Sequence, residues 1–217
     1  MHKKRYAKKV IQILNRQNLI AILLRGYDEI CSGEFNDLDI FVGHDLDLVC
    51  EAFRHELSSD FIVSFEPGFM YTKALLRDKK TNKIALDVDL FQSVHRYWWP
   101  LCKVSRMDGF KQKIDDITVC CLSETKEFQI TLSKEILTYR RLRLKQQNRL
   151  RQIYYSLSQK NKMLVRNELG TSEIFLNTIL CGRKLNFIEA SCFIFNLPMF
   201  SLRLLPRWLK YKINRRT

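Results

Sequence analysis

The chain has 217 residues, 46% of them hydrophobic and 12% aromatic, which is enough for one compact core with a smaller helical companion and excludes a disordered chain. Its formal net charge of +14 predicts an anionic partner, such as a nucleotide, a nucleic acid, a phosphorylated sugar or a membrane surface. The seven cysteines include no CxxC pair, which argues against a zinc site.

The first half of the chain alternates between helical and extended patterns. These patterns predict a helix over residues 5–17, strands over 19–24, 37–42, 61–65, 69–76 and 84–91, and a helix that Asp45 caps and whose apolar face runs from Leu46 to Leu57. Gly26 follows the first strand, where a glycine would let the backbone approach a ligand closely. The fold class predicted for this half is α/β (α+β).

The character of the chain changes after residue 123. Residues 120–122 predict a last short strand, and the segments after residue 124 have helical spacing without strand alternation. Gly170 is expected to end one helix, Thr171 or Ser172 to cap the next, and Asn186 with Glu189 to form a capping box. We therefore expect two domains, residues 1–123 and a helical region over residues 124–217.

Two Asp-x-Asp motifs lie on predicted strands. Asp37 and Asp39 project from one face of their strand, because successive side chains of a strand alternate between faces. Asp87 and Asp89 repeat this spacing on a strand that can lie beside the first. Closely spaced carboxylates are tolerated best where a cation neutralises them, and Mg²⁺ prefers such oxygen ligands and keeps positions for water and phosphate. The motifs predict a metal-dependent phosphate-transfer site.

Other aromatic and basic residues allow two interpretations each. His95, Trp98 and Trp99 form either a substrate wall or part of the core. The basic run over residues 140–151 is either a solvated helix face or a nucleic-acid surface. The segment over residues 193–213 mixes Phe, Leu and Trp with Arg and Lys, and forms either a helix on an anionic membrane or an ordinary packed helix.

The expected location is cytoplasmic, with peripheral membrane contact as the alternative. No stretch reaches the roughly twenty apolar residues of a membrane span. Seven cysteines, an odd number, do not fit a closed disulfide framework, and we expect mostly buried thiols in a reducing compartment.

The order of these motifs resembles the nucleotidyltransferase superfamily with its polymerase-beta-like fold. This resemblance implies a small mixed sheet flanked by helices, followed by a helical C-terminal region. A strand, Gly26, a spacer of ten residues and Asp37-Leu38-Asp39 match the signature of that family. The form Leu24-Arg25-Gly26, with a helical second half, looks more narrowly like nucleotidyltransferase-like proteins of bacterial surface-polysaccharide gene clusters.

The resemblance implies the roles of the site residues. Asp37, Asp39 and Asp89, with Asp87 as the alternative to Asp89, would hold Mg²⁺ or Mn²⁺, two ions in such enzymes. Gly26 would contact the nucleotide, and Arg25 is a charged neighbour that could touch phosphate. The implied reaction moves a nucleoside monophosphate from an NTP to a small hydroxyl or phosphate acceptor in surface-polysaccharide synthesis.

One residue departs from the family pattern. Tyr27 stands where the family usually has Gly or Ser in contact with the triphosphate. The alternative function is therefore a catalytically degenerate domain that binds RNA or an anionic membrane through its basic helices.

Overall fold

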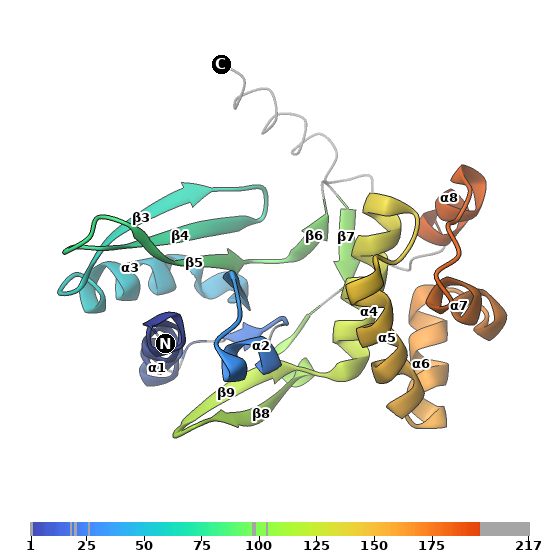
Figure 1. Cartoon of the computed structure of the whole chain (residues 1–217), viewed down its shortest axis with the longest axis horizontal. Helices are drawn as coiled ribbons and strands as arrows, with labels where there is room; N and C mark the ends of the chain where they lie inside the picture. Colours follow the sequence, from blue (N-terminus) through green and yellow to red (C-terminus); the bar gives the residue numbers. More distant parts are fainter. Residues whose placement is uncertain are drawn as a thin grey trace, which may run out of the picture. The chain divides into compact units, whose positions relative to one another are not determined.

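The computed structural model describes residues 2–17, 19, 21–25, 27–96, 99–102 and 104–195, and the chain divides into two compact units (Figure 1). Unit 1 comprises residues 1–93 and 104–122, and unit 2 comprises residues 94–103 and 123–217. The chain therefore passes from one unit to the other three times. Each unit has its own hydrophobic core.

A seven-stranded mixed sheet is the centre of unit 1, with the strand order β3-β4-β5-β2-β1-β9-β8 (Figure 1). The pairs β2–β5 and β1–β9 are parallel and the other pairs are antiparallel. The strands are β1 (Ile22–Leu23), β2 (Asp37–Phe41), β3 (Phe61–Pro67), β4 (Tyr71–Asp78), β5 (Ile84–Phe91), β8 (Gly109–Ile114) and β9 (Ile117–Leu122). The helices of this unit are α1 (His2–Arg16), α2 (Tyr27–Ser32) and α3 (Leu46–Glu56), with short 3-10 turns at Gly43–Asp45 and Arg106–Asp108. The α/β class with a small mixed sheet flanked by helices is confirmed.

The central strands bury one face against α1 and α3. Leu38 and Ile40 of β2 are almost fully buried, as are Val88 and Leu90 of β5, and all four belong to one apolar cluster with residues of both helices. Side chains alternate along a strand. The odd-numbered residues of β2 and β5, which include the four aspartates of the two Asp-x-Asp motifs, therefore project from the opposite face of the sheet.

The strand predicted over residues 19–24 is wrong in length, since β1 has only two residues. The N–H of Leu19 donates to the carbonyl of Leu14 at 3.3 Å, so the backbone at Leu19 still contacts the last turn of α1. The N–H of Leu24 donates to the carbonyl of Asp39 at 2.9 Å, so the backbone stays against β2 beyond the end of β1. This contact brings Arg25 to the acidic end of β2.

Three strands lie in a region for which we predicted none. They are β6 (Val94–Arg96), β7 (Trp99–Cys102) and β8, and β9 begins at Ile117 instead of residue 120. β8 is an edge strand with exposed Lys111 and Lys113, so its sequence lacks the apolar alternation of a half-buried strand. In the turn to β9, Asp115 has a φ of 54°, in the left-handed region. The Asp115-Asp116 pair predicts such a hairpin turn less clearly than an Asn-Gly pair would.

The described part of unit 2 contains the β6–β7 hairpin, which contacts α4, and five helices. The helices are α4 (Glu124–Tyr139), α5 (Leu144–Ser156), α6 (Gln159–Leu169), α7 (Glu173–Leu180) and α8 (Phe187–Phe195). The helical character predicted after residue 124 is confirmed for the described part of this region.

The predicted helix ends of unit 2 are confirmed. Gly170 ends α6 at φ 58°, in the left-handed region. The Ser172 hydroxyl accepts the N–H of Phe175 at 3.2 Å. Asn186 and Glu189 form the reciprocal capping box, with N–H to side-chain oxygen distances of 2.9 and 2.8 Å. By contrast, Asp45 occupies the N-cap of α3 without a side-chain hydrogen bond to that helix.

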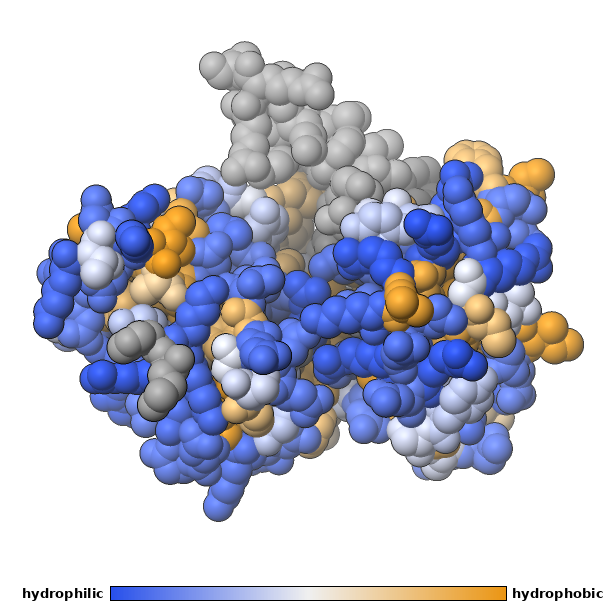
Figure 2. Space-filling model, viewed as in Figure 1, coloured by the Kyte–Doolittle hydropathy of each residue, from blue (hydrophilic) through white to orange (hydrophobic). Residues whose placement is uncertain are grey.

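The surface is largely hydrophilic on the face that Figure 2 shows, interrupted by separate hydrophobic patches. Cys50 and Cys121 are buried, whereas Cys181 and Cys192 are exposed and two further cysteines are half-buried. The expectation of mostly buried thiols is therefore wrong for the described cysteines. Among the described helices, none combines the length and the apolar composition needed to span a membrane.

The apolar core on the other face of the acidic strands predicts how a substitution at Leu38 changes the free energy of unfolding. Leu38 lies between Asp37 and Asp39 and is 1% exposed. We expect Leu38→Ala to lower the free energy of unfolding by about 2 to 5 kcal/mol, because it removes buried methyl groups and leaves a cavity. Urea unfolding of the full chain, followed by circular dichroism, measures this change.

A matched control lies on α3. Leu48 is 55% exposed, so Leu48→Ala should change the free energy of unfolding by less than about 0.5 kcal/mol. Equal losses in the two variants would contradict the assignment of Leu38 to the core.

Candidate metal and phosphate site

The site is set by the parallel pairing of β2 with β5. In this register Asp37 lies opposite Asp87, and Asp39 lies opposite Asp89. All four carboxylates therefore project from the same face of two neighbouring strands. The structure brings together the two motifs that lie about fifty positions apart in the sequence.

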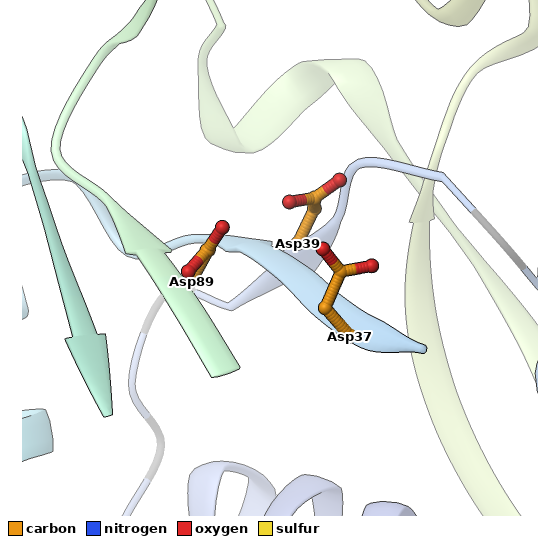
Figure 3. Close-up of side chains that lie close together, drawn as sticks. All are labelled: Asp37, Asp39 and Asp89. Atoms are coloured by element: carbon orange, nitrogen blue, oxygen red, sulfur yellow. The ribbon is translucent and has the colours of Figure 1, made fainter. Parts of the chain in front are cut away.

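Three of the carboxylates converge on one point. Asp37, Asp39 and Asp89 each offer one carboxylate oxygen, and these oxygens all lie within 4.8 Å of one another. Figure 3 shows Asp37 and Asp39 on β2 and Asp89 on β5, with the three side chains on the same side of the strands. Asp39 is 7% exposed, whereas the side chain of Asp37 is 38% exposed. The cluster thus has a buried side and an open side.

Arg25 is the first of two cations at this cluster. Its Nε donates to the carboxylate of Asp39, and its Nη2 lies 4.0 Å from Oδ1 of Asp37. The Arg25 side chain is 41% exposed, so part of the guanidinium is open to solvent. A guanidinium in this position stabilises the buried charge of Asp39 and has donors left for an anion such as phosphate.

Lys73 is the second cation, and sequence reasoning missed it. It lies on β4 directly opposite Asp89, and its Nζ is 3.6 Å from Oδ2 of Asp87 and 3.6 Å from Oδ1 of Asp89. Burial lowers the pKa of Lys73, but the charges of Asp89 and Asp87 outweigh this and raise it above its ordinary value. Lys73 is therefore charged at neutral pH.

Asp89 is the carboxylate with the most perturbed acidity. Its pKa is raised to about 6, first by burial and then by the negative charge of Asp39, and Lys73 opposes the rise. Oδ1 of Asp87 and Oδ1 of Asp89 are buried and have no hydrogen-bond partner in the part of the chain that the structure describes. Among the described residues, Asp87 and Asp89 on β5 thus each keep a buried oxygen without a hydrogen bond, whereas Asp39 accepts a hydrogen bond from Arg25.

These residues fit a hard divalent cation. Mg²⁺ and Mn²⁺ prefer oxygen ligands, and three carboxylate oxygens from two adjacent strands leave other positions for water or phosphate. One buried oxygen of Asp87 and one of Asp89 lack a hydrogen bond within the described part of the chain, and a bound cation could coordinate them as further ligands. Asp87 stays the alternative third ligand, since it projects from the same face.

Tyr27 has a structural environment of its own. It begins α2, its side chain packs against the apolar cluster of unit 1, and its hydroxyl donates to the carbonyl of Lys113 at 2.6 Å. A Gly or Ser at this position could not make these contacts. Tyr27 therefore fastens the start of α2 to β8, the edge strand of the sheet.

Several predicted functional residues lie outside the described residues. Gly26, Trp98 and residues 196–213 of the basic-aromatic segment belong to this group, as do the side chains of His95 and Trp99. The membrane and substrate-wall interpretations of these residues therefore stay predictions.

The basic run over residues 140–151 is partly ion-paired. Arg143 binds the buried carboxylate of Glu135, with Nη2 2.6 Å from Oε1, and Nε of Arg149 lies 2.6 Å from Oε1 of Glu127. Arg140, Arg141 and Arg151 are exposed. Part of this run thus stabilises unit 2, and the nucleic-acid interpretation stays a prediction.

Comparison with known proteins gives no family assignment. No protein-family model and no curated protein matches the chain. Among solved structures, the chain is similar to the crystal structure of an antigenic nucleotidyltransferase-like protein from Paracoccidioides brasiliensis, with a TM-score of 0.47 and 14% sequence identity. The alignment covers 87% of this chain and 96% of that chain. A likeness at this TM-score carries no argument about activity, so the site is interpreted from its own geometry.

The raised pKa of Asp89 predicts how the stability of the protein depends on pH. Its carboxyl has a pKa of about 6 in the folded protein and an ordinary value near 3.8. The folded state therefore binds more protons than the unfolded state between about pH 4 and pH 6, and stability falls as pH rises through this window. We expect Asp89→Asn to stabilise the metal-free protein by about 1 to 3 kcal/mol at pH 7.5 and to change its stability little at pH 4. Urea unfolding at the two pH values, in the presence of a chelator, measures the difference.

Asp78 provides a control with the opposite sign. Its carboxylate accepts the N–H groups of Thr81 and Lys80 at 2.8 and 2.9 Å, and the Thr81 hydrogen bond is the main cause of its lowered pKa. Asp78→Asn should therefore destabilise the protein at neutral pH. A loss of stability for Asp89→Asn that matches the loss for Asp78→Asn would show that Asp89 is an ordinary stabilising carboxylate.

Proposed function

We propose that this chain is a metal-dependent nucleotidyltransferase that moves a nucleoside monophosphate from an NTP to a small acceptor. The single observation that supports it most is the convergence of Asp37, Asp39 and Asp89 from two adjacent strands. The motif around Asp37 resembles that of the nucleotidyltransferase superfamily, and this resemblance suggests nucleotidyl transfer as the reaction. The motif Leu24-Arg25-Gly26 resembles nucleotidyltransferase-like proteins of bacterial surface-polysaccharide gene clusters. From this resemblance we infer that the acceptor is a sugar hydroxyl or a sugar phosphate.

Asp37, Asp39 and Asp89 would hold the metal, Mg²⁺ or Mn²⁺. When bound, the metal supplies positive charge that neutralises the triphosphate and lowers the pKa of the attacking hydroxyl. The protein supplies the position of these ligands, because the strand backbone and the buried residues between them fix the carboxylates in advance.

Two side chains have further roles in this proposal. Arg25 binds the carboxylate of Asp39 and offers guanidinium N–H donors to the phosphates of the nucleotide. Asp89 accepts the proton of the attacking hydroxyl as the hydroxyl oxygen bonds to the α-phosphorus of the NTP and pyrophosphate leaves.

The proposal predicts the effect of removing the β2 carboxylates. We expect Asp37→Asn and Asp39→Asn each to lower the transfer of label from an α-labelled NTP to sugar acceptors by a factor of about a thousand or more, since each removes a charge that holds the metal. The assay uses the full chain with Mg²⁺, and a chelator should stop the transfer as well.

Asp47→Asn is the matched control. Asp47 is an exposed carboxylate on α3, the helix that packs on the other face of the sheet, and its replacement should leave the transfer unchanged. Transfer that survives both Asp37→Asn and Asp39→Asn would refute the proposed function.

A further inference from the structure

Lys73 lies at the β5 side of the acidic site and forms ion pairs with both Asp87 and Asp89. Its strand, β4, pairs with β5 on the side away from β2, so its ammonium approaches Asp87 and Asp89 from the edge opposite to Asp37 and Asp39. It lies at the same distance, 3.6 Å, from one oxygen of each of these two carboxylates. The ammonium therefore bridges the two carboxylates as a cation does.

The charges of the site leave room for one divalent ion. Four carboxylates, Asp37, Asp39, Asp87 and Asp89, face two resident cations, Arg25 and Lys73. Two negative charges remain, which one divalent ion neutralises. A second ion beside Asp87 and Asp89 would lie within a few ångströms of the Lys73 ammonium, where like charges repel strongly.

The two resident cations do not compete equally with the metal. Arg25 binds Asp39 from the β1 side of the cluster, and its guanidinium can turn to an incoming phosphate because part of it is exposed. Lys73 contacts both acidic residues of β5, and one of them, Asp87, is outside the converging group of three. The Asp87–Lys73 pair thus stays available as a fixed neutral unit when Asp89 binds the metal.

We propose that Lys73 takes the place of a divalent ion beside Asp87 and Asp89, so that the nucleotide-free site of this chain binds one divalent ion, held by Asp37, Asp39 and Asp89. This inference rests on the proposed function, because it assumes that Asp37, Asp39 and Asp89 form a metal site. Lys73 is then a positioning residue that sets the number of ions, and Asp87 is the carboxylate that holds its ammonium in place.

The experiment counts bound Mn²⁺ on the full chain in the absence of nucleotide. Electron paramagnetic resonance of free Mn²⁺ during a titration gives the stoichiometry and the affinity directly. We expect one Mn²⁺ per wild-type chain and two per Lys73→Met chain, since the variant frees Asp87 and Asp89 as ligands for a second ion. The double variant Lys73→Met with Asp87→Asn should return to one ion.

Lys111→Met is the matched control. It makes the same change of charge at an exposed position of β8 in the same sheet, and its stoichiometry should equal that of the wild type. Circular dichroism establishes that each variant is folded before the titration. Lys73→Arg, which keeps the positive charge, should also bind one ion.

The outcomes separate this inference from the proposed function. Two ions on the wild-type chain, or one ion on both the wild type and Lys73→Met, would overturn the role of Lys73 and leave the metal site intact. No saturable binding to either chain would instead refute the metal site and with it the proposed function. A second ion that also appears in Lys111→Met would show a general effect of charge and would overturn the assignment to Lys73.

Discussion

The pairing of β2 with β5 is the constraint on which the site depends. Four carboxylates on two adjacent strands repel one another, yet the register that aligns them is the one that also buries Leu38 and Val88 on the opposite face. Burying such side chains contributes about 1.5 to 3 kcal/mol each, and a slip of one residue would exchange the two faces. Apolar packing below the sheet therefore holds the charges together above it.

The neighbours of this strand pair complete the electrostatics. In the order β4-β5-β2-β1, the two acidic strands lie in the middle, β4 carries Lys73, and the chain leaving β1 carries Arg25. Each acidic strand thus has a cation on its outer side. Charge compensation within the sheet makes a cluster of carboxylates tolerable before any ligand binds. Asp89 nevertheless keeps a raised pKa, because it is buried and lies near the negative charge of Asp39.

The two strands that carry the aspartates could be predicted from the sequence, whereas Lys73 and the edge strand β8 could not. The alternation of residues 37–42 and 84–91 identifies both strands, because one buried face leaves a period of two. Lys73 could not be assigned, since its strand was predicted but the antiparallel register that places it opposite Asp89 depends on tertiary pairing. β8 was missed because an edge strand with exposed lysines has no apolar alternation. The domain limit at residue 123 stays a prediction.

The interleaving of the two units has a consequence for synthesis. Residues 94–103 leave the ribosome before any residue of α4, the helix that their hairpin contacts. Val94 and Leu101 of this hairpin are each 4% exposed in the finished structure, and the hairpin lacks its contacts with α4 until that helix has been made. A chain that stops near residue 122 would carry this hairpin without the helix that contacts it. Such intermediates, with exposed strands and apolar surface, are prone to aggregate.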